Sequence, residues 1–295
     1  WTDAGNLGDS MKLIYRGENG FSETFTTEGP PLLITAADGL YGYDNSVHTV
    51  TRHMQDGCNY ISGQLSARRI GITVQIFGNV VSTRTRIMKA LSPKTLGKFE
   101  LIRGDYKREI KCVIEKISVN TSDGSIINIM ALCPNPFWRE ERESRVDIAA
   151  WTKKFKYPLT VEQGIGFIFG ERTEMRVINV LNTGDVGVGM RVVFSAMAAV
   201  TNPAIVDAMD ETKYLRMTCT MQPGDMITIS TGMGEKRVTL MRSATGKEEN
   251  AFGMLVPTST FMQLGVGDNL LRYEADSGED WLCTAVFFYP SYLGV

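Results

Sequence analysis

The stretch Leu132-Cys133-Pro134-Asn135-Pro136-Phe137-Trp138 divides this chain in two. Two prolines spaced by one residue end the alternating apolar segment before them, because proline has no backbone N–H for a sheet ladder and forces the preceding residue into an extended conformation. Phe137 and Trp138 are large aromatic side chains that need cover, and we expect them to pack on the part of the chain that precedes them. The sequence therefore predicts a domain junction at Pro134, Pro136, Phe137 and Trp138.

A short charged run, Arg139 to Arg145, follows the junction and has neither strand alternation nor enough apolar residues to pack. We interpret 139–150 as a linker between an N-terminal domain, 11–138, and a C-terminal domain, 151–295. A length of 295 residues agrees with two domains. Residues 1–10 are polar, do not resemble a signal peptide and precede Met11, so we expect them to be a tag remnant.

The composition is that of a soluble globular protein, with 43% hydrophobic and 22% charged residues. No apolar run approaches the roughly 20 residues that a membrane helix needs, so no membrane partner is expected. Residues 11–145 hold 18 Lys and Arg against 14 Asp and Glu, and residues 146–295 hold 13 against 17. This asymmetry supports two domains but is too mild for a nucleic-acid footprint, and no sequence-specific nucleic-acid partner is predicted.

Five cysteines are present, an odd number, and most of them lie in apolar alternating segments where a small hydrophobic residue would serve equally well. The sequence predicts reduced thiols and a compartment like the cytosol during folding.

The N-terminal half is typical of an α+β domain, a β-sheet or split barrel with one helix. Its clearest strand is Arg69 to Phe77, in which apolar residues recur with a period of two. We expect a helix from Thr83 to Leu91 with Ser82 as its N-cap. Gly104-Asp105 predicts the turn of a β-hairpin. The polar segment Tyr43 to Gly63 is expected to form a loop or a long hairpin.

The C-terminal half changes to short strands separated by turn signals, which is typical of a β-sandwich. The expected strands are Met175 to Leu181, Met190 to Ala196, Tyr214 to Met221, Met226 to Thr231, Arg237 to Met241, Leu270 to Tyr273 and Trp281 to Tyr289. The fold class predicted for the whole chain is mainly β, in two domains.

Residues with metal-binding or catalytic chemistry are few. His48, His53 and Cys58 lie five residues apart in one loop, but closed zinc sites need four ligands at tighter spacing, so ordinary loop residues are the better interpretation. A serine in a GxSxG elbow is absent. The acidic cluster of Asp207, Asp210 and Glu211 indicates a solvated loop. We predict no catalytic residue, no metal and no cofactor.

A glycine-rich stretch, Gly184 to Gly189, follows a strand but precedes another strand, so it lacks the helix N-terminus that holds a phosphate. Basic side chains gather on the predicted helix, where Arg84, Arg86 and Lys89 share a face. A solvated face, a subunit contact and a nucleic-acid contact remain open, the last disfavoured because no aromatic residues interleave to stack bases. Together with Arg69 they are the candidate subunit contacts.

The order of features in the N-terminal half resembles the N-terminal domain of siphophage distal tail proteins. The resemblance includes the Asp56-Gly57 loop, the Arg68-Arg69-Ile70 strand, the helix closed by Leu91-Ser92-Pro93, the hairpin, and the strand that enters Cys133-Pro134-Asn135-Pro136-Phe137-Trp138. The C-terminal half is similar to the second domain of that family at Asn182 to Asp185, Pro223 to Asp225, Ser259 to Phe261, Leu264 to Asn269 and Tyr292 to Val295.

The resemblance implies a structural protein of a phage or prophage virion, assembled in the cytoplasm of the bacterial host. In the family, a hexameric ring of N-terminal domains joins the tail tube to the baseplate and the host-adhesion apparatus, and it catalyses nothing. The expected partners are other copies of the chain, the tail tube protein and tail-associated or receptor-binding proteins.

The resemblance also implies a C-terminal sandwich of the galectin or carbohydrate-binding-module kind. The alternative function is therefore a binding module of a tail adhesin that recognises cell-wall carbohydrate. Its candidate aromatic residues are Trp151, Tyr157, Tyr289 and Tyr292, because Trp281 and Phe287 are expected to face inward. A tail-associated hydrolase is the third alternative, disfavoured by the missing nucleophile and metal signatures.

Overall fold

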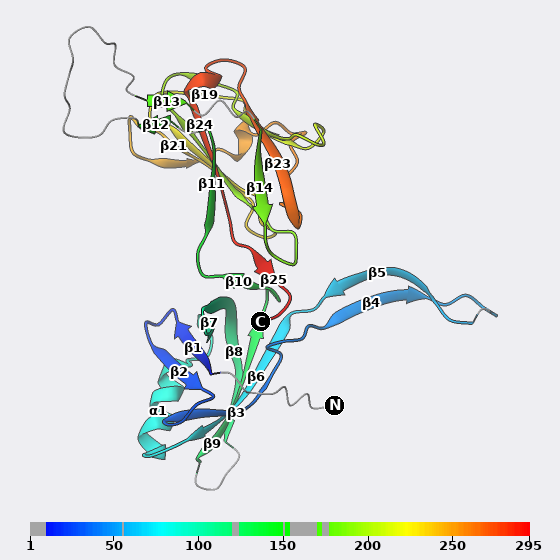
Figure 1. The fold of residues 1–295 in the computed structure, drawn as a ribbon, viewed down its shortest axis with the longest axis vertical. Coiled ribbons are helices and arrows are strands. Elements are labelled where there is room, and N and C mark those ends of the chain that lie inside the picture. The colour runs from blue at the N-terminus through cyan, green and yellow to red at the C-terminus, as the bar shows by residue number, and fades with distance from the viewer. Residues whose placement is uncertain (1–9, 55, 120–123, 150, 154–169, 173–176) are drawn as a thin grey trace. The chain divides into compact units, whose positions relative to one another are not determined.

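The computed structural model describes residues 10–54, 56–119, 124–149, 151–153, 170–172 and 177–295 (Figure 1). The chain forms two compact units. Residues up to 141 together with 291–295 make unit 1, and residues 142–290 make unit 2. Both are mainly β, and the described residues include one α-helix and two short 3-10 helices. No helix among them is long and apolar enough to cross a membrane.

Unit 1 is built on a barrel of seven strands. Its strands, in spatial order, are β1 (Met11–Gly17), β2 (Ser22–Thr26), β3 (Leu32–Asp38), β6 (Arg68–Ile76), β9 (Ile126–Cys133), β8 (Tyr106–Val119) and β7 (Leu96–Arg103), which returns to β1. All neighbours are antiparallel except β2 and β3, which are parallel and pair only through Thr26 and Leu33. The barrel closes because β8 is long enough to pair with β7 along its first half and with β9 along its second.

The barrel core follows the period of two that the sequence predicted for β6. Ile70, Ile72, Val74 and Ile76 all point inward and are at most 3% exposed. The predicted hairpin around Gly104-Asp105 is confirmed as β7 and β8. Apolar residues of the other barrel strands complete one contiguous core.

The helix α1 (Val80–Ala90) is confirmed, but it begins earlier than predicted. Its N-cap is Asn79 rather than Ser82, because the Asn79 side chain accepts a hydrogen bond from the backbone N–H of Ser82. Both residue types are good caps. Asn79, which lies closer to β6 than Ser82, caps the helix. The helix therefore begins at Val80, which packs against the barrel core.

A two-stranded hairpin, β4 (Asn45–Val50) and β5 (Asn59–Leu65), lies in the connection between β3 and β6 (Figure 1). A loop or a long hairpin was expected for Tyr43 to Gly63, and the structure has the hairpin. The chain enters it through Gly39, which has a φ of +73° and where a Cβ would stand only 1.9 Å from the carbonyl oxygen of Arg69. Only glycine fits at that position.

The predicted linker at 139–150 is wrong. β10 (Trp138–Glu140) pairs with β8 in unit 1, and β11 (Ser144–Ala149) belongs to unit 2. The charges of this run form ion pairs with strands far away in the sequence, including Arg139 with Glu109 and Glu143 with Arg191. These ion pairs hold the segment against neighbouring strands, so it forms strands even though it has no amphipathic pattern of its own.

The prediction placed the last five residues, 291–295, in the sandwich, but they belong to unit 1. β25 (Ser291–Tyr292) pairs with β10, so that Tyr292 lies opposite Trp138. Trp138 is fully buried, as predicted, and its Nε1 donates a hydrogen bond to the carbonyl oxygen of Leu40 at 3.2 Å. Phe137 is half-buried and Pro134 is exposed.

Unit 2 contains two antiparallel sheets that enclose one apolar core. The larger sheet has the order β11, β24 (Leu282–Phe288), β15 (Arg191–Ala196), β20 (Met226–Ser230), β21 (Arg237–Met241) and β22 (Glu248–Asn250). The smaller has the order β14 (Val177–Asn182), β23 (Gly267–Glu274), β17 (Ala204–Asp207) and β18 (Tyr214–Arg216). This agrees with the predicted sandwich, whereas its galectin-like character stays a prediction.

Short elements complete unit 2. They are the paired strands β16 (Val200–Thr201) and β19 (Thr220–Met221), the paired strands β12 (Trp151–Lys153) and β13 (Gly170–Arg172), and the 3-10 helices η1 (Phe252–Met254) and η2 (Glu279–Trp281). The predicted single strand from Tyr214 to Met221 is thus two strands, β18 and β19, which belong to different sheets.

Candidate functional site

The hairpin β4–β5 is the most exposed regular structure in unit 1. Twelve of its thirteen strand residues are exposed, and only Leu65 is half-buried. Neither strand contains Asp, Glu, Lys or Arg. The two strands pair with each other and with no other strand of the described chain. An isolated two-stranded hairpin is marginally stable in water, so this one needs further support.

The two faces of the hairpin differ in chemistry. Val47 pairs with Gly63 and Thr49 pairs with Tyr60, which places these side chains on one face. The Tyr60 hydroxyl and the Asn45 side-chain amide oxygen both lie over Gly63, each 3.1 Å from where a Cβ would stand. Val47 is 55% exposed and Tyr60 is 68% exposed. We call this side of the hairpin, defined by Val47, Thr49, Tyr60 and Gly63, the apolar hairpin face.

The opposite side of the hairpin is mostly polar, and its apolar residue on β4 is Val50, which pairs with Asn59 and is 46% exposed. Ser46 pairs with Gln64, and His48 pairs with Ser62. A register irregularity between His48 and Thr49 leaves Ile61 as the extra residue of β5, and it is 61% exposed. A polar face suits solvent, whereas an exposed apolar face is a feature of protein interaction sites.

Three of the four predicted subunit contacts have partners among the residues that the structure describes. Arg86 pairs with Glu23 at 2.8 Å, and Arg69 pairs with Glu115 at 3.2 Å. The Lys89 ammonium lies 4.6 Å from the centre of the Phe21 ring. The guanidinium of Arg84 lies beside Gly124. Arg69 is on β6 and the other three are on α1, so the structure gives no common patch for all four, and their role in subunit contact stays a prediction.

Residues considered for metal and acid chemistry occupy ordinary surface positions. Among the described residues, no group of His, Cys, Asp or Glu has the arrangement of a metal site. His48 lies on the polar face of the hairpin, and Cys58 precedes β5 and is exposed. Asp210 pairs with Lys213 at 3.0 Å within its turn, and Glu211 pairs with Arg272 at 3.1 Å. The third acidic residue, Asp207, accepts a hydrogen bond from the backbone N–H of Met209.

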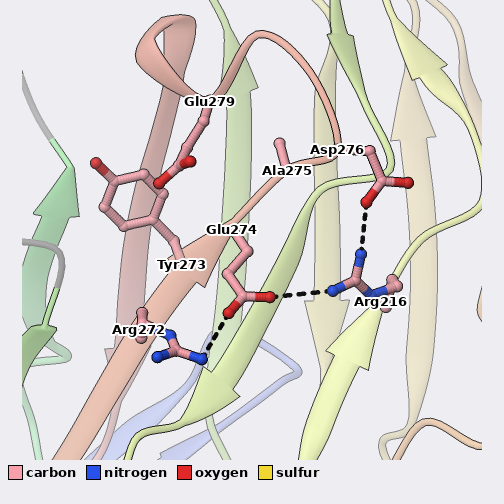
Figure 2. Close-up of a pocket in the computed structure, with 7 residues that line it drawn as sticks. All are labelled: Arg216, Arg272, Tyr273, Glu274, Ala275, Asp276 and Glu279. Carbon is pink, nitrogen blue, oxygen red and sulfur yellow. Dashed lines mark hydrogen bonds and ion pairs between the residues drawn. The ribbon is translucent and has the colours of Figure 1, made fainter.

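A charged pocket of about 350 Å³ lies in unit 2 beside β23 and β18 (Figure 2). Its lining residues are Arg216, Arg272, Tyr273, Glu274, Ala275, Asp276 and Glu279. Glu274 accepts from Arg216 at 3.0 Å and from Arg272 at 2.7 Å, and Asp276 accepts from Arg216 at 2.8 Å. Burial alone would lower the pKa of Arg272, but the charge of Glu274 and the hydrogen bonds to Glu211 and Glu274 outweigh this and raise the pKa.

Guanidinium and carboxylate groups alternate along this pocket and neutralise one another. Tyr273 is only 2% exposed, so its ring belongs to the core and offers no platform for stacking a sugar. The arrangement is an ion-pair network that covers the outer side of the smaller sheet. Sequence reasoning missed it, because its members lie on strands separated by more than fifty residues.

The described part of unit 2 shows no row of exposed aromatic side chains of the kind that glycan-binding modules present. Its exposed aromatics are Phe252, at 47%, and Trp281, at 46%. The expectation that Trp281 and Phe287 face inward is wrong, because Leu282, Thr284, Val286 and Phe288 take the inward positions of β24. Tyr289 is half-buried, Tyr292 belongs to unit 1, and the side chains of Trp151 and Tyr157 lie outside the described residues.

Comparison with known proteins gives no matching family model and no matching curated protein. Solved structures do match. The structure of Dit (gp 19.1) of phage SPP1, described as a paradigm of the hub adsorption apparatus in phages that infect Gram-positive bacteria, matches with a TM-score of 0.67. The match covers 95% of this chain and 99% of that chain, at 16% sequence identity.

This chain has the fold of the phage Dit hub proteins. The phage P2 baseplate in its activated conformation with Ca also matches, with a TM-score of 0.56 at 9% identity, over 97% of this chain and 99% of that chain. The form with Sr gives a TM-score of 0.56 at 9% identity, over 98% and 100%. The resemblance to distal tail proteins is thereby confirmed for the fold, over nearly the whole chain. Fold alone does not establish function.

Proposed function

We propose that this chain is a structural hub protein of a phage tail tip, which associates with further copies of itself into a ring. The ring has six copies in this proposal and joins the tail tube to the host-adhesion apparatus of the virion. The fold shared with phage hub and baseplate proteins supports the role. The observation that carries self-association is the unsupported, uncharged hairpin with its exposed apolar face.

The hairpin favours a protein partner over solvent for two reasons. Val47, Tyr60 and Ile61 expose apolar surface on a short element, and burying such surface contributes about 25 cal/mol per Å². In addition, the absence of charged residues in both strands means that no ionised group must be desolvated on docking.

The partner in this proposal is a second copy of the chain, with the hairpin of one copy seated on a different part of the next. Contacts of this kind are heterologous, and they generate a closed ring when the rotation between copies closes. The chain has no catalytic role in this proposal. Its partners along the tail are the tail tube protein on one side and tail-associated or receptor-binding proteins on the other.

The test is the solution mass of the full chain, measured by light scattering over a range of protein concentrations. The expected particle has six times the 32.7 kDa mass of the chain. Val47→Asp places a charge on the apolar hairpin face and should reduce the particle to monomers. The matched control is Ser46→Asp, which adds the same charge to the polar face and should leave the mass unchanged.

Two results would overturn the proposal. One is a wild-type chain that stays monomeric at the highest concentration reached. The other is a Val47→Asp variant that assembles as well as the Ser46→Asp control, which would show that the hairpin takes no part in assembly.

A further inference from the structure

We propose that Cys112 and Cys133 form a buried dithiol that a peroxide oxidises to a disulfide across β8 and β9 of the barrel. This inference goes beyond the proposed hub function and does not depend on self-assembly. It assigns a chemical role to two of the five cysteines, which the sequence alone treats as small core residues.

Strand pairing brings the two thiols to face each other. Val113 of β8 pairs with Leu132 of β9, so the next step along the same antiparallel register places Cys112 opposite Cys133. Both cysteines are fully buried and belong to the barrel core, whereas Val113 and Leu132 are half-buried. The Cα atoms of directly opposed residues in an antiparallel pair lie about 4.5–5.5 Å apart, within the roughly 4.4–6.8 Å that a disulfide spans.

The pair lies at the place where the barrel closes. Cys112 pairs with Gly97 of β7, and the next residue, Val113, pairs with both Leu96 of β7 and Leu132 of β9. Cys112 is therefore at the point where β8 changes from one neighbour to the other. Cys133 is the last residue of β9. A disulfide here would fix the closing contact of the barrel and the point where the chain leaves β9.

Tyr15 supplies a hydroxyl beside this pair. Its side chain is fully buried, and the hydroxyl has no hydrogen-bond partner among the described residues. The hydroxyl lies directly over Gly97, where any Cβ would collide with it, and Gly97 is the residue opposite Cys112. A buried hydroxyl without a partner is costly, so it is a donor ready for an oxygen atom formed next to Cys112.

The Tyr15 hydroxyl keeps its proton for that purpose. Burial is the main cause that raises the pKa of Tyr15 to about 12, and the neighbouring Cys112 and Glu18 add to the effect. A neutral phenol donates a hydrogen bond to an oxygen atom more readily than a phenolate could, because a phenolate has no proton to donate.

The oxidation takes place in two balanced steps. Cys133, as a thiolate, attacks one oxygen of hydrogen peroxide, the O–O bond breaks, and the other oxygen leaves as hydroxide and becomes water with the proton that Cys133 lost. Cys133 is then a sulfenic acid, whose oxygen accepts a hydrogen bond from Tyr15. Cys112 attacks this sulfur, the S–O bond breaks, and the oxygen leaves as a second water with the proton of Cys112. The two thiols lose two electrons, and the peroxide is reduced to two waters.

A peroxide suits this pair because both thiols are fully buried, so that a small uncharged oxidant reaches them more easily than a bulky thiol reagent. A chain that folds in a reducing cytosol keeps all five thiols until an oxidant is added. Release of a virion into an oxidising medium would then provide the occasion for the disulfide. Only this last step rests on the proposed function.

The experiment uses the full chain with Cys58→Ser, which removes the exposed thiol. The protein is prepared under reductant, desalted and treated with hydrogen peroxide under native conditions, and its thiols are counted in denaturant over time. The count should fall from four to two, and peptide mapping should find Cys112 joined to Cys133. The melting temperature of unit 1 should rise by about 10 °C, because a disulfide restricts the unfolded chain, and dithiothreitol should reverse both changes.

Two further substitutions in the same background provide the controls. Cys133→Ala should keep its three thiols and show no rise in melting temperature, and it also reports any other effect of peroxide, such as methionine oxidation. Where that variant does not fold, Cys112→Ala replaces it. Cys283→Ala removes a thiol of unit 2 and should still lose two thiols to the disulfide.

Tyr15→Phe tests the hydroxyl separately. The variant should form the disulfide up to roughly tenfold more slowly, the effect expected for one lost hydrogen bond. The reduced variant should melt at the wild-type temperature or above, because the hydroxyl that it lacks has no partner in the described structure. An unchanged rate of oxidation would show that Tyr15 takes no part.

Two results would overturn the dithiol itself. One is a chain that keeps all four thiols after a treatment that fully oxidises free cysteine. The other is a peptide map in which Cys112 and Cys133 carry added oxygen but are not joined. Neither result bears on the hub function, which is tested by the mass of the particle, and a monomeric chain would leave the dithiol unaffected.

Discussion

Glu100 and Glu109 lie directly opposite each other across β7 and β8, and both are at least 96% buried. Like charges in such a cross-strand pair are destabilising unless cations neutralise them. Here the Lys98 ammonium lies between the two carboxylates, 3.0 Å from Glu100 and 2.6 Å from Glu109. Arg16 adds a hydrogen bond to Glu100 at 2.8 Å, and Arg139 contacts Glu109 from β10. Ion pairs therefore connect β1, β7, β8 and β10 on the outside of the barrel.

The first prediction concerns the pH dependence of unit 1. Burial alone would raise the pKa of Glu100, but hydrogen bonds from Lys98 and Arg16 outweigh it and hold the pKa below its usual value. A carboxyl with a lowered pKa binds fewer protons when folded than when unfolded. Its contribution is therefore complete above the unfolded pKa of about 4.3 and is lost as pH falls through the folded pKa.

Thermal melts between pH 7 and pH 3 should show the transition of unit 1 moving to lower temperature. Glu100→Gln should lower the transition at pH 7 and make its dependence on acid shallower, because the substituted amide does not titrate. An equally steep dependence in the variant would show that other carboxyls account for the acid sensitivity.

The second prediction concerns Trp138. Its side chain is fully buried against the barrel core, and its indole N–H is paired with the Leu40 carbonyl. Trp138→Ala should cost about 3–5 kcal/mol of the unfolding free energy of unit 1. Calorimetry should show two transitions with only that of unit 1 lowered, and the isolated sandwich, 142–290, provides the reference for the other. An unchanged melt would contradict the packing of this residue.

Strands with strong alternation and residues with strict backbone demands could be predicted from the sequence. Ile70 to Ile76 could only form a half-buried strand, and the two prolines at Pro134 and Pro136 located the end of β9. The burial of Trp138 followed, because a large aromatic beside a completed domain requires cover. These features depend on local sequence, and the structure agrees with it.

Features that depend on distant partners could not be predicted. β25 is two residues long and has no pattern of its own, so its return to unit 1 is visible only in its pairing with β10. The strand β24 carries apolar residues on both faces, and Phe287 points outward, where the Arg191 guanidinium lies 4.2 Å from the centre of its ring.

The third prediction concerns Arg68, whose side chain is nearly fully buried. Its guanidinium donates to the carbonyl oxygens of Pro136 at 2.8 Å, Gly39 at 3.0 Å and Leu40 at 3.1 Å, and also to that of Leu293. It thus joins the hairpin base, the junction and the returning C-terminal residues. Arg68→Met should lower the stability of unit 1 by several kcal/mol, because each carbonyl left unpaired costs about 1–3 kcal/mol.

Arg68→Lys is the informative comparison in denaturant unfolding. A lysine keeps the charge but cannot direct donors to four separate carbonyls, so it should recover only a small part of the loss. Full recovery would show that charge, rather than the forked geometry of the guanidinium, holds these segments.

The fourth prediction concerns the cysteines. None of the five forms a disulfide in the structure, and only Cys58 is exposed. The hydrogen bond with Cys133, together with burial, raises the pKa of the Cys112 thiol, which keeps it protonated and unreactive. A thiol reagent added to the folded protein should therefore label Cys58 rapidly and the other four slowly, and unfolding in denaturant should release all five. Cys58→Ser provides the control and should remove the fast phase alone. A total of three or one in denaturant would reveal a disulfide and contradict the reduced state expected for this protein.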